Sequence, residues 1–111
     1  MSKKVGSPVR GSTTGRPVMV LFDVLGRRWT MRILWELRDG PLTFRALQDQ
    51  CEQVSPTLLN GRLKDLRKLN LVDQGDDGYV LTKWGAELGK QLAHLDQWSE
   101  KWAAELPMTR E

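Results

Sequence analysis

Leucine, valine and tryptophan recur along the chain at intervals of three and four residues, the spacing of one buried helix face. This repeat predicts helices over residues 17–25, from about 28 to 38, over 44–51, 56–69 and 83–106. Helix-ending residues separate the segments, namely Gly26, Asp39-Gly40-Pro41 and Pro107. The link Pro41 to Thr43 is long enough only for an extended connection or one sheet strand.

Ser55 and Pro56 mark the clearest helix start. Serine caps the free amides of a first turn, and proline at the first helical position has no amide to leave unpaired. The leucines that follow form one apolar stripe, namely Leu59, Leu63, Leu66 and Leu69. The opposite face carries Thr57, Asn60, Gly61, Lys64 and Lys68.

A β-hairpin is predicted after this helix, because residues 71–74 and 79–81 flank the turn sequence Gly75-Asp76-Asp77-Gly78. Thr43 and Thr82 stand where the third and last helices need an N-cap. Two short helices joined by residues 52–54 and followed at once by a hairpin describe a winged helix-turn-helix. The predicted fold is mainly α with a small β-hairpin wing.

The length of 111 residues suits one domain, which we place at residues 16–106. Residues 1–15 are basic and poor in apolar side chains, so we expect a flexible arm, and residues 107–111 form a tail. No apolar run is long enough for a membrane helix, and none follows the N-terminal lysines as in a secretory signal. The single cysteine fits a reducing compartment, so we expect a cytoplasmic protein.

The chemistry of the side chains argues against an enzyme. The chain has one histidine and one cysteine, His94 and Cys51, far apart in sequence. It has no zinc-type spacing and no glycine-rich phosphate loop, so we predict neither a metal nor a cofactor. We expect His94 at the surface or at an interface. We expect Cys51 to be structural, with acidic neighbours that raise its pKa.

Charge distribution is more informative than the net charge of +3. The first 38 residues are strongly basic, and the remainder is acidic on balance. Within that remainder, the segment 55–69 contains one acidic residue, Asp65, and four basic residues, Arg62, Lys64, Arg67 and Lys68. Such a segment indicates a local face for phosphates, although Arg67 and Lys68 also suit a solvated helix end favoured by the dipole.

An ordered set of short motifs runs from residue 17 to residue 88. They are Pro17-Val18, Leu25-Gly26-Arg27-Arg28-Trp29-Thr30, Ile33-Leu34-Trp35-Glu36-Leu37, Asp39-Gly40-Pro41, Phe44, Leu47, Ser55-Pro56, Leu59, Arg62-Leu63, Leu66, Leu71-Val72, Tyr79-Val80-Leu81-Thr82, Gly85 and Leu88. In this order the set resembles the HxlR family of bacterial winged-helix regulators. The resemblance implies a homodimer, built by the first and last helices, that binds operator DNA as a repressor or activator.

Two positions depart from that family. Many members carry an oxidant-sensing or electrophile-sensing cysteine just before the Pro-Val pair, and Arg16 stands there in this chain. The predicted wing tip, Asp76-Asp77, is acidic where related proteins often place basic residues. The first departure excludes sensing by that thiol, and the second argues against wing contact with the minor groove.

The helix beginning at Pro56 is the predicted DNA reader. Asn60 suits bidentate contact with adenine, and Lys64 suits guanine. Gly61 permits close approach either to DNA or to the third helix, and Arg62 either clamps a phosphate or pairs with an acidic neighbour. The full predicted DNA-binding set is Thr43, Arg45, Ser55, Pro56, Thr57, Asn60, Gly61, Arg62 and Lys64.

The last helix carries a longer apolar stripe than so small a domain needs. We expect Trp84 and Leu88 to point inward and the rest to meet a second copy. The predicted dimer interface comprises Val18, Leu21, Phe22, Leu92, Leu95, Trp98 and Trp102.

Two other interpretations remain open. A winged helix that binds proteins and never touches DNA would explain the acidic wing and modest net charge. A tryptophan-lined pocket between subunits would bind a small-molecule effector of unknown identity, although aromatic stripes at helical spacing are more often core.

Overall fold

The computed structural model describes residues 16–107, so the predicted arm at 1–15 and residues 108–111 of the predicted tail lie outside the described residues. The elements are α1 (Pro17–Leu25), α2 (Thr30–Glu36), the 3-10 turn η1 (Leu37–Asp39), α3 (Phe44–Gln50), α4 (Pro56–Lys68), β1 (Val72–Gly75), β2 (Gly78–Leu81) and α5 (Lys83–Glu105). The prediction of a mainly helical chain with one hairpin is confirmed.

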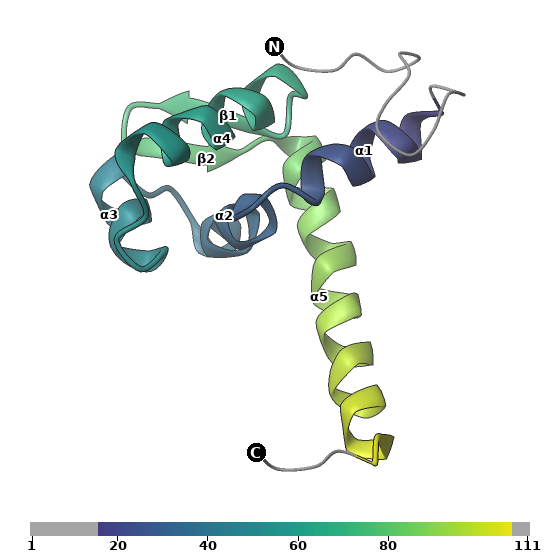
Figure 1. Cartoon of the computed structure of the whole chain (residues 1–111). Coiled ribbons are helices and arrows are strands. Elements are labelled where there is room, and N and C mark those ends of the chain that lie inside the picture. Colours follow the sequence, from purple (N-terminus) through teal and green to yellow (C-terminus); the bar gives the residue numbers. More distant parts are fainter. Residues whose placement is uncertain (1–15, 108–111) are drawn as a thin grey trace.

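The molecule has a compact head and one projecting helix (Figure 1). The head contains α2, α3, α4 and the hairpin, while α1 lies beside the first turns of α5. The C-terminal half of α5 runs away from the head, which gives the chain extents of 45 × 37 × 26 Å. The start of that half still borders α2, because Leu95, Asp96 and Ser99 line a pocket together with Met31, Arg32 and Trp35.

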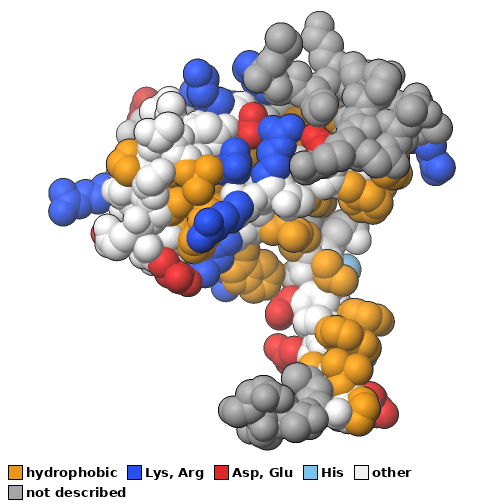
Figure 2. All heavy atoms as spheres, in the orientation of Figure 1, with side chains coloured by type: hydrophobic (Ala, Val, Ile, Leu, Met, Phe, Trp, Pro, Cys, Tyr) orange, Lys and Arg blue, Asp and Glu red, His pale blue; other side chains and the backbone are white. Residues whose placement is uncertain are grey.

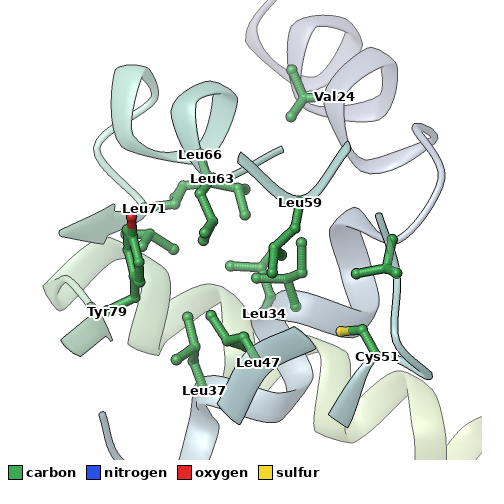
Figure 3. Packing of buried hydrophobic residues seen from close by; sticks show 13 residues of the cluster. Val24, Leu34, Leu37, Leu47, Cys51, Leu59, Leu63, Leu66, Leu71 and Tyr79 are labelled. Atoms are coloured by element: carbon green, nitrogen blue, oxygen red, sulfur yellow. The ribbon is translucent and has the colours of Figure 1, made fainter. Parts of the chain in front are cut away.

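The core of the head is built around α4. Its residues Leu59, Leu63 and Leu66 are fully or almost fully buried and point toward side chains from α2, α3 and the hairpin (Figure 3). Each buried leucine contributes roughly 1.5–3 kcal/mol relative to an exposed one. The apolar stripe predicted from sequence is thus the inner face of α4, and its polar positions necessarily point outward.

Three predicted N-caps are present. The side-chain oxygens of Thr43, Ser55 and Thr82 accept hydrogen bonds from the amides three residues ahead, at 3.1, 3.1 and 3.0 Å. Each cap satisfies an amide that the first turn leaves unpaired. The starts of α3, α4 and α5 are therefore fixed by local chemistry.

The start of α2 lies about two residues later than the helical periodicity predicts. The helix begins at Thr30, and Trp29 at its N-cap has a left-handed φ of 76°. The chain must change direction between α1 and α2, and amide-to-carbonyl turns at Arg27 and Thr30 accomplish this. Residues 28 and 29, which periodicity alone assigns to α2, therefore form part of this tight connection.

The wing is a two-stranded antiparallel hairpin in which Val72 pairs with Leu81 and Gly75 with Gly78. The link before α3 joins it, because Leu42 and Tyr79 exchange backbone hydrogen bonds of 3.0 and 2.8 Å. Gly78 has a φ of 122°, and a Cβ there would overlap the Leu42 carbonyl. A side chain at this position would therefore break the contact between the wing and the link.

The first turn of α5 packs against backbone at Gly85. A Cβ on Gly85 would overlap the carbonyl of Leu71, whereas a Cβ on Gly89 would meet only the Leu81 side chain at 3.9 Å. The two glycines share one helix and differ in the space around them.

We predict that Gly85→Ala lowers the free energy of unfolding by about 2 kcal/mol, because the helix must shift off the Leu71 carbonyl. Gly89→Ala is the matched control and should raise stability by up to about 1 kcal/mol through helix propensity. Urea unfolding at one fixed protein concentration measures both. Equal effects of the two substitutions would contradict this account of the packing.

Candidate nucleic-acid interface

The outward face of α4 is polar, basic and accessible. Thr57, Gly61, Lys64 and Lys68 follow one another at spacings of four, three and four, so they form one row along the helix. Thr57, Lys64 and Lys68 are exposed, as is Asn60 beside the row. The structure thus brings most of the predicted reading residues onto a single surface.

Gly61 lies in the middle of this row. A Cβ built on it would have no heavy atom within 4 Å. Packing against α3, one of the two predicted roles of this glycine, is therefore wrong. Within the described chain nothing requires the absence of a side chain here.

The two flanks of the row face different parts of the head. On the wing side, Arg67 Nη1 donates a long hydrogen bond of 3.4 Å to Gln74 Oε1 on β1. On the other side, Arg62 and Asp65 face the connection between α1 and α2. The outer surface of α4 is thus bordered by the wing and by the connection from α1.

Arg62 is held by contacts within the chain. Its Nε donates to the backbone oxygen of Arg28 at 2.9 Å, and its Nη1 lies 3.8 Å from Asp65 Oδ2. The acidic-neighbour alternative therefore describes the arrangement seen in the structure. A phosphate contact by Arg62 stays a prediction.

Arg27 bridges α1 and α4. Its Nη1 donates to Asp65 Oδ2 at 2.8 Å, and its Nη2 donates to Asp23 Oδ2 at 3.0 Å. Burial lowers the pKa of Arg27, but the hydrogen bonds and charges of Asp65 and Asp23 outweigh it, so the pKa lies above its ordinary value. The guanidinium therefore stays charged and ties α4 to α1.

Sequence reasoning missed this bridge. Asp23 and Arg27 are four residues apart on a predicted helix and its end, which is the only signal that the sequence offers. Asp65 is 38 residues from Arg27, and only the packed fold brings the two together.

The remaining predicted DNA residues lie on α3 or at the helix starts. Arg45 on α3 is exposed, and Thr43 and Ser55 use their hydroxyls as caps. The turn between α3 and α4 is fixed by left-handed residues Glu52 and Gln53, with φ of 58° and 60°. This turn sets the direction in which α4 leaves α3.

Lysine and arginine side chains gather over the head, on the side where α4 lies (Figure 2). The wing tip is different, because its exposed residues Asp76 and Asp77 are acidic. The positive surface charge on this side therefore comes from α4 and its neighbours rather than from the wing tip.

A second surface, on α1 and α5, is apolar. Phe22, Trp98 and Trp102 are exposed by 57%, 57% and 50%. The rings of Trp98 and Trp102 stack with centroids 5.6 Å apart. Hydrophobic side chains line one edge of the projecting half of α5 (Figure 2). Among the other predicted interface residues, Val18 and Leu95 are exposed, and Leu21 and Leu92 pack partly on the core.

The prediction that Trp84 points inward is wrong, because this side chain is 57% exposed. The buried residue of this first turn is instead Gly85, which faces the Leu71 carbonyl. Leu88 packs against the core as predicted.

Cys51 is buried at the end of α3, and its sulfur points into the core (Figure 3). Burial raises the pKa of its thiol, the nearby Arg32 lowers it, and Glu36 and Glu52 raise it further. The predicted direction is correct, but desolvation is the main cause. The thiol is therefore protonated and shielded in the folded chain.

His94 is exposed on α5. Within residues 16–107, histidine, cysteine and carboxylate side chains do not gather into a group of three that would hold a metal ion. Nor does any helix in that range combine the length and apolar content needed to cross a bilayer.

Two helices joined by a short turn, α3 and α4, are followed at once by the hairpin of β1 and β2, and the polar face of α4 points outward. This is the arrangement of a winged helix-turn-helix. Residues 24–107 match the family model described as HxlR-like helix-turn-helix. The chain belongs to the HxlR-like family. It is therefore a helix-turn-helix transcriptional regulator that binds DNA.

Relatives of this HxlR-like chain carry the same description. It is 31% identical over 88 residues to an uncharacterised HTH-type transcriptional regulator, MJ0925, of Methanocaldococcus jannaschii, covering 76% of this chain and 83% of the relative. It is 26% identical over 98 residues to the HTH-type transcriptional regulator YodB of Bacillus subtilis, covering 82% and 88%.

Solved structures agree with the fold. The quinone-bound YodB of Bacillus subtilis superposes with a TM-score of 0.70 at 28% identity, covering 76% of this chain and 96% of that one. A possible HxlR family transcriptional factor of Thermoplasma volcanium gives a TM-score of 0.69 at 26% identity, covering 80% and 86%. The winged-helix architecture predicted from the sequence is confirmed.

Proposed function

We propose that this HxlR-like chain acts as a homodimer that binds operator DNA with α4 in the major groove. The observation that carries the proposal is the outer face of α4, which is exposed, basic and open at Gly61. An α-helix is about as wide as the major groove of B-DNA, so this face meets base edges.

Each residue of the face has a distinct role in the proposal. Asn60 reads an adenine through its amide, and Lys64 donates to a guanine. Thr57 and the first amides of α4 meet phosphate near the helix N-terminus, where Ser55 and Pro56 set the start. Contacts with the backbone position the helix without reading sequence, and we assign them to Thr43, Arg45 and Arg62.

Arg62 would have to exchange its partners to bind phosphate. Its bond to the Arg28 carbonyl and its approach to Asp65 hold it at the edge of α4. Because Arg27 also neutralises Asp65, the carboxylate keeps a partner when Arg62 turns outward. The bridge thus leaves Arg62 available for DNA.

The dimer is proposed to form through α1 and α5. The second half of α5 projects beyond the head, and its exposed Trp98 and Trp102 would be covered by a second copy. A two-fold dimer presents two α4 helices to half-sites about 34–36 Å apart. This arrangement accounts for an apolar stripe that the described chain does not bury by itself.

Regulation by a thiol is not part of the proposed function. YodB has been solved in a quinone-bound form and in a reduced form. Here the single cysteine, Cys51, is buried in the head with a raised pKa. Any effector of this regulator would therefore act by another route.

We predict saturable binding to DNA from upstream of the regulator's own gene, weakening steeply with salt as phosphate contacts are lost. Asn60→Ala should reduce discrimination at one base pair by about 1–3 kcal/mol, because the bidentate contact is lost. Fluorescence anisotropy with a panel of single-base operator variants measures this. Gln97→Ala, on exposed α5, is the control. An unchanged operator preference in Asn60→Ala would remove Asn60 from the readers.

If the wild-type protein binds this DNA no better than random duplex at low salt, the prediction of an operator upstream of its own gene is contradicted. The protein-interaction alternative would then regain weight.

We predict that Gly61→Ala separates stability from DNA binding. The added methyl group has open space in the free protein, so helix propensity should raise stability by up to about 1 kcal/mol. The same methyl would meet DNA in the complex and should weaken operator affinity at least tenfold. Gly89→Ala serves as the control. Unchanged affinity would show that the α4 backbone stays away from the bases.

We predict that the double variant Trp98→Ala/Trp102→Ala dissociates into monomers that keep their helical content. Loss of a central aromatic contact typically costs at least about 2 kcal/mol at an interface, or a roughly thirtyfold rise in dissociation constant for each residue. Light scattering with circular dichroism checks both properties. Gln97→Ala on the same helix should remain dimeric, and a double variant that stays dimeric would place the interface elsewhere.

A further inference from the structure

A groove of about 370 Å³ lies between the C-terminal half of α4 and the first strand of the wing. Its lining residues are Lys64, Arg67, Lys68, Asn70, Val72 and Asp73. The three cations all come from α4, whereas the wing supplies the single carboxylate. The groove therefore has a basic wall and an acidic wall.

The cations of this groove take part in no salt bridge within the described part of the chain. Among the described residues, Lys64, Arg67 and Lys68 form no ion pair with a carboxylate, in contrast to Arg27 and Arg62 on the opposite flank. Arg67 instead makes one long hydrogen bond to Gln74, which holds its guanidinium beside the wing. A concave surface with three unpaired cations favours an anionic ligand.

The position of the groove points to the nature of that ligand. Lys64 and Lys68 continue the row of Thr57 and Gly61, so the groove adjoins the proposed reading surface. A helix fills the width of the major groove, and the two phosphate backbones consequently run along its flanks. The backbone on the wing side would pass through this groove.

The acidic residues of the wing restrict where that backbone lies. Asp73 borders the groove, and Asp76 and Asp77 are exposed at the tip. Their carboxylates repel phosphate, while the helix wall attracts it. A strand is thus drawn toward α4, and the wing tip is kept out of the minor groove.

Resting on the proposed function, we propose that this groove is a second binding site for DNA, specific for the phosphate backbone of one strand. Arg67 and Lys68 hold the phosphates, and Lys64 lies at the boundary between backbone and base contacts. The groove supplies the affinity on the wing side that an acidic wing tip does not supply. Arg67 and Lys68 therefore do more than favour the helix dipole.

The test compares two double variants that remove the same charge. Arg67→Gln/Lys68→Gln removes two of the three cations of the basic wall and leaves Lys64, and Lys90→Gln/Lys101→Gln removes two exposed cations from α5. Operator affinity is measured by fluorescence anisotropy across a salt series, with single-base operator variants at one salt concentration. Circular dichroism verifies that both variants fold.

We expect the groove variant to lose about 1.8 from the slope of log affinity against log salt, about 0.9 for each phosphate contact. Its order of preference among operator variants should match that of the wild type, because backbone contacts carry no sequence information. The α5 variant should keep the wild-type slope. Equal slopes in the two variants, or an altered sequence preference in the groove variant alone, would overturn the proposal.

Two further measurements complete the test. The first asks whether the wild-type protein binds an operator at all, and the second asks whether the groove binds a small anion instead of the DNA backbone. Wild-type protein that binds no operator specifically would overturn the proposed function itself, whatever the variants do. Thermal melting with inorganic phosphate, against chloride at equal ionic strength, distinguishes a free anion from the DNA backbone. Stabilisation by phosphate of the wild type, lost in Arg67→Gln/Lys68→Gln, would assign the groove to a small anion and overturn its role as a backbone site.

Discussion

The burial of one face of α4 is the constraint on which the rest of this structure depends. Leu59, Leu63 and Leu66 occupy the centre of the head, where every other element of the head packs against them. Removing these side chains from water fixes the rotation of the helix about its axis. The polar row from Thr57 to Lys68 then points outward without any interaction of its own to hold it there.

Rotation alone does not fix the position of α4 relative to α1. Here a charged bridge on one flank of α4 contributes to that placement. Arg27 connects Asp65 on α4 to Asp23 on α1, through hydrogen bonds of 2.8 and 3.0 Å in a partly buried setting. Because α1 also belongs to the proposed dimer surface, the same guanidinium would relate α4 to the two-fold partner in the proposed dimer. A partly buried, charge-assisted pair resists sliding better than apolar contacts, which have no preferred direction.

The opposite flank shows a different use of charge. There the cations of α4 face an acidic wing across a groove, and they have no carboxylate partner among residues 16–107. On the α1 flank, opposite charges meet and stabilise the fold. On the wing flank they are kept apart, which leaves positive charge for a ligand. The flank that we propose to bind the DNA backbone is thus the one whose cations are unpaired within the described chain.

Much of this molecule is determined by local sequence. Ser55-Pro56, Thr43 and Thr82 set three helix starts through caps that involve only neighbouring residues, and the Gly-Asp-Asp-Gly turn sets the hairpin. The leucine period defines the inner face of α4, and therefore most of the outer residues that we propose to contact DNA. These features were predictable because their physical causes act within a few residues.

Other features depend on contacts between distant segments, and only the tertiary structure decided them. Arg27 and Asp65 are 38 residues apart in sequence, and they pair only because the segments that carry them pack together. In the first turn of α5, Gly85 is buried against the Leu71 carbonyl and Trp84 is exposed, an arrangement that depends on how α5 packs on a distant segment. Open space around Gly61 and the groove beside Lys68 are properties of what surrounds a residue, which periodicity does not contain. Local chemistry specified the elements, and the packing of those elements decided which charges are paired and which remain free to bind.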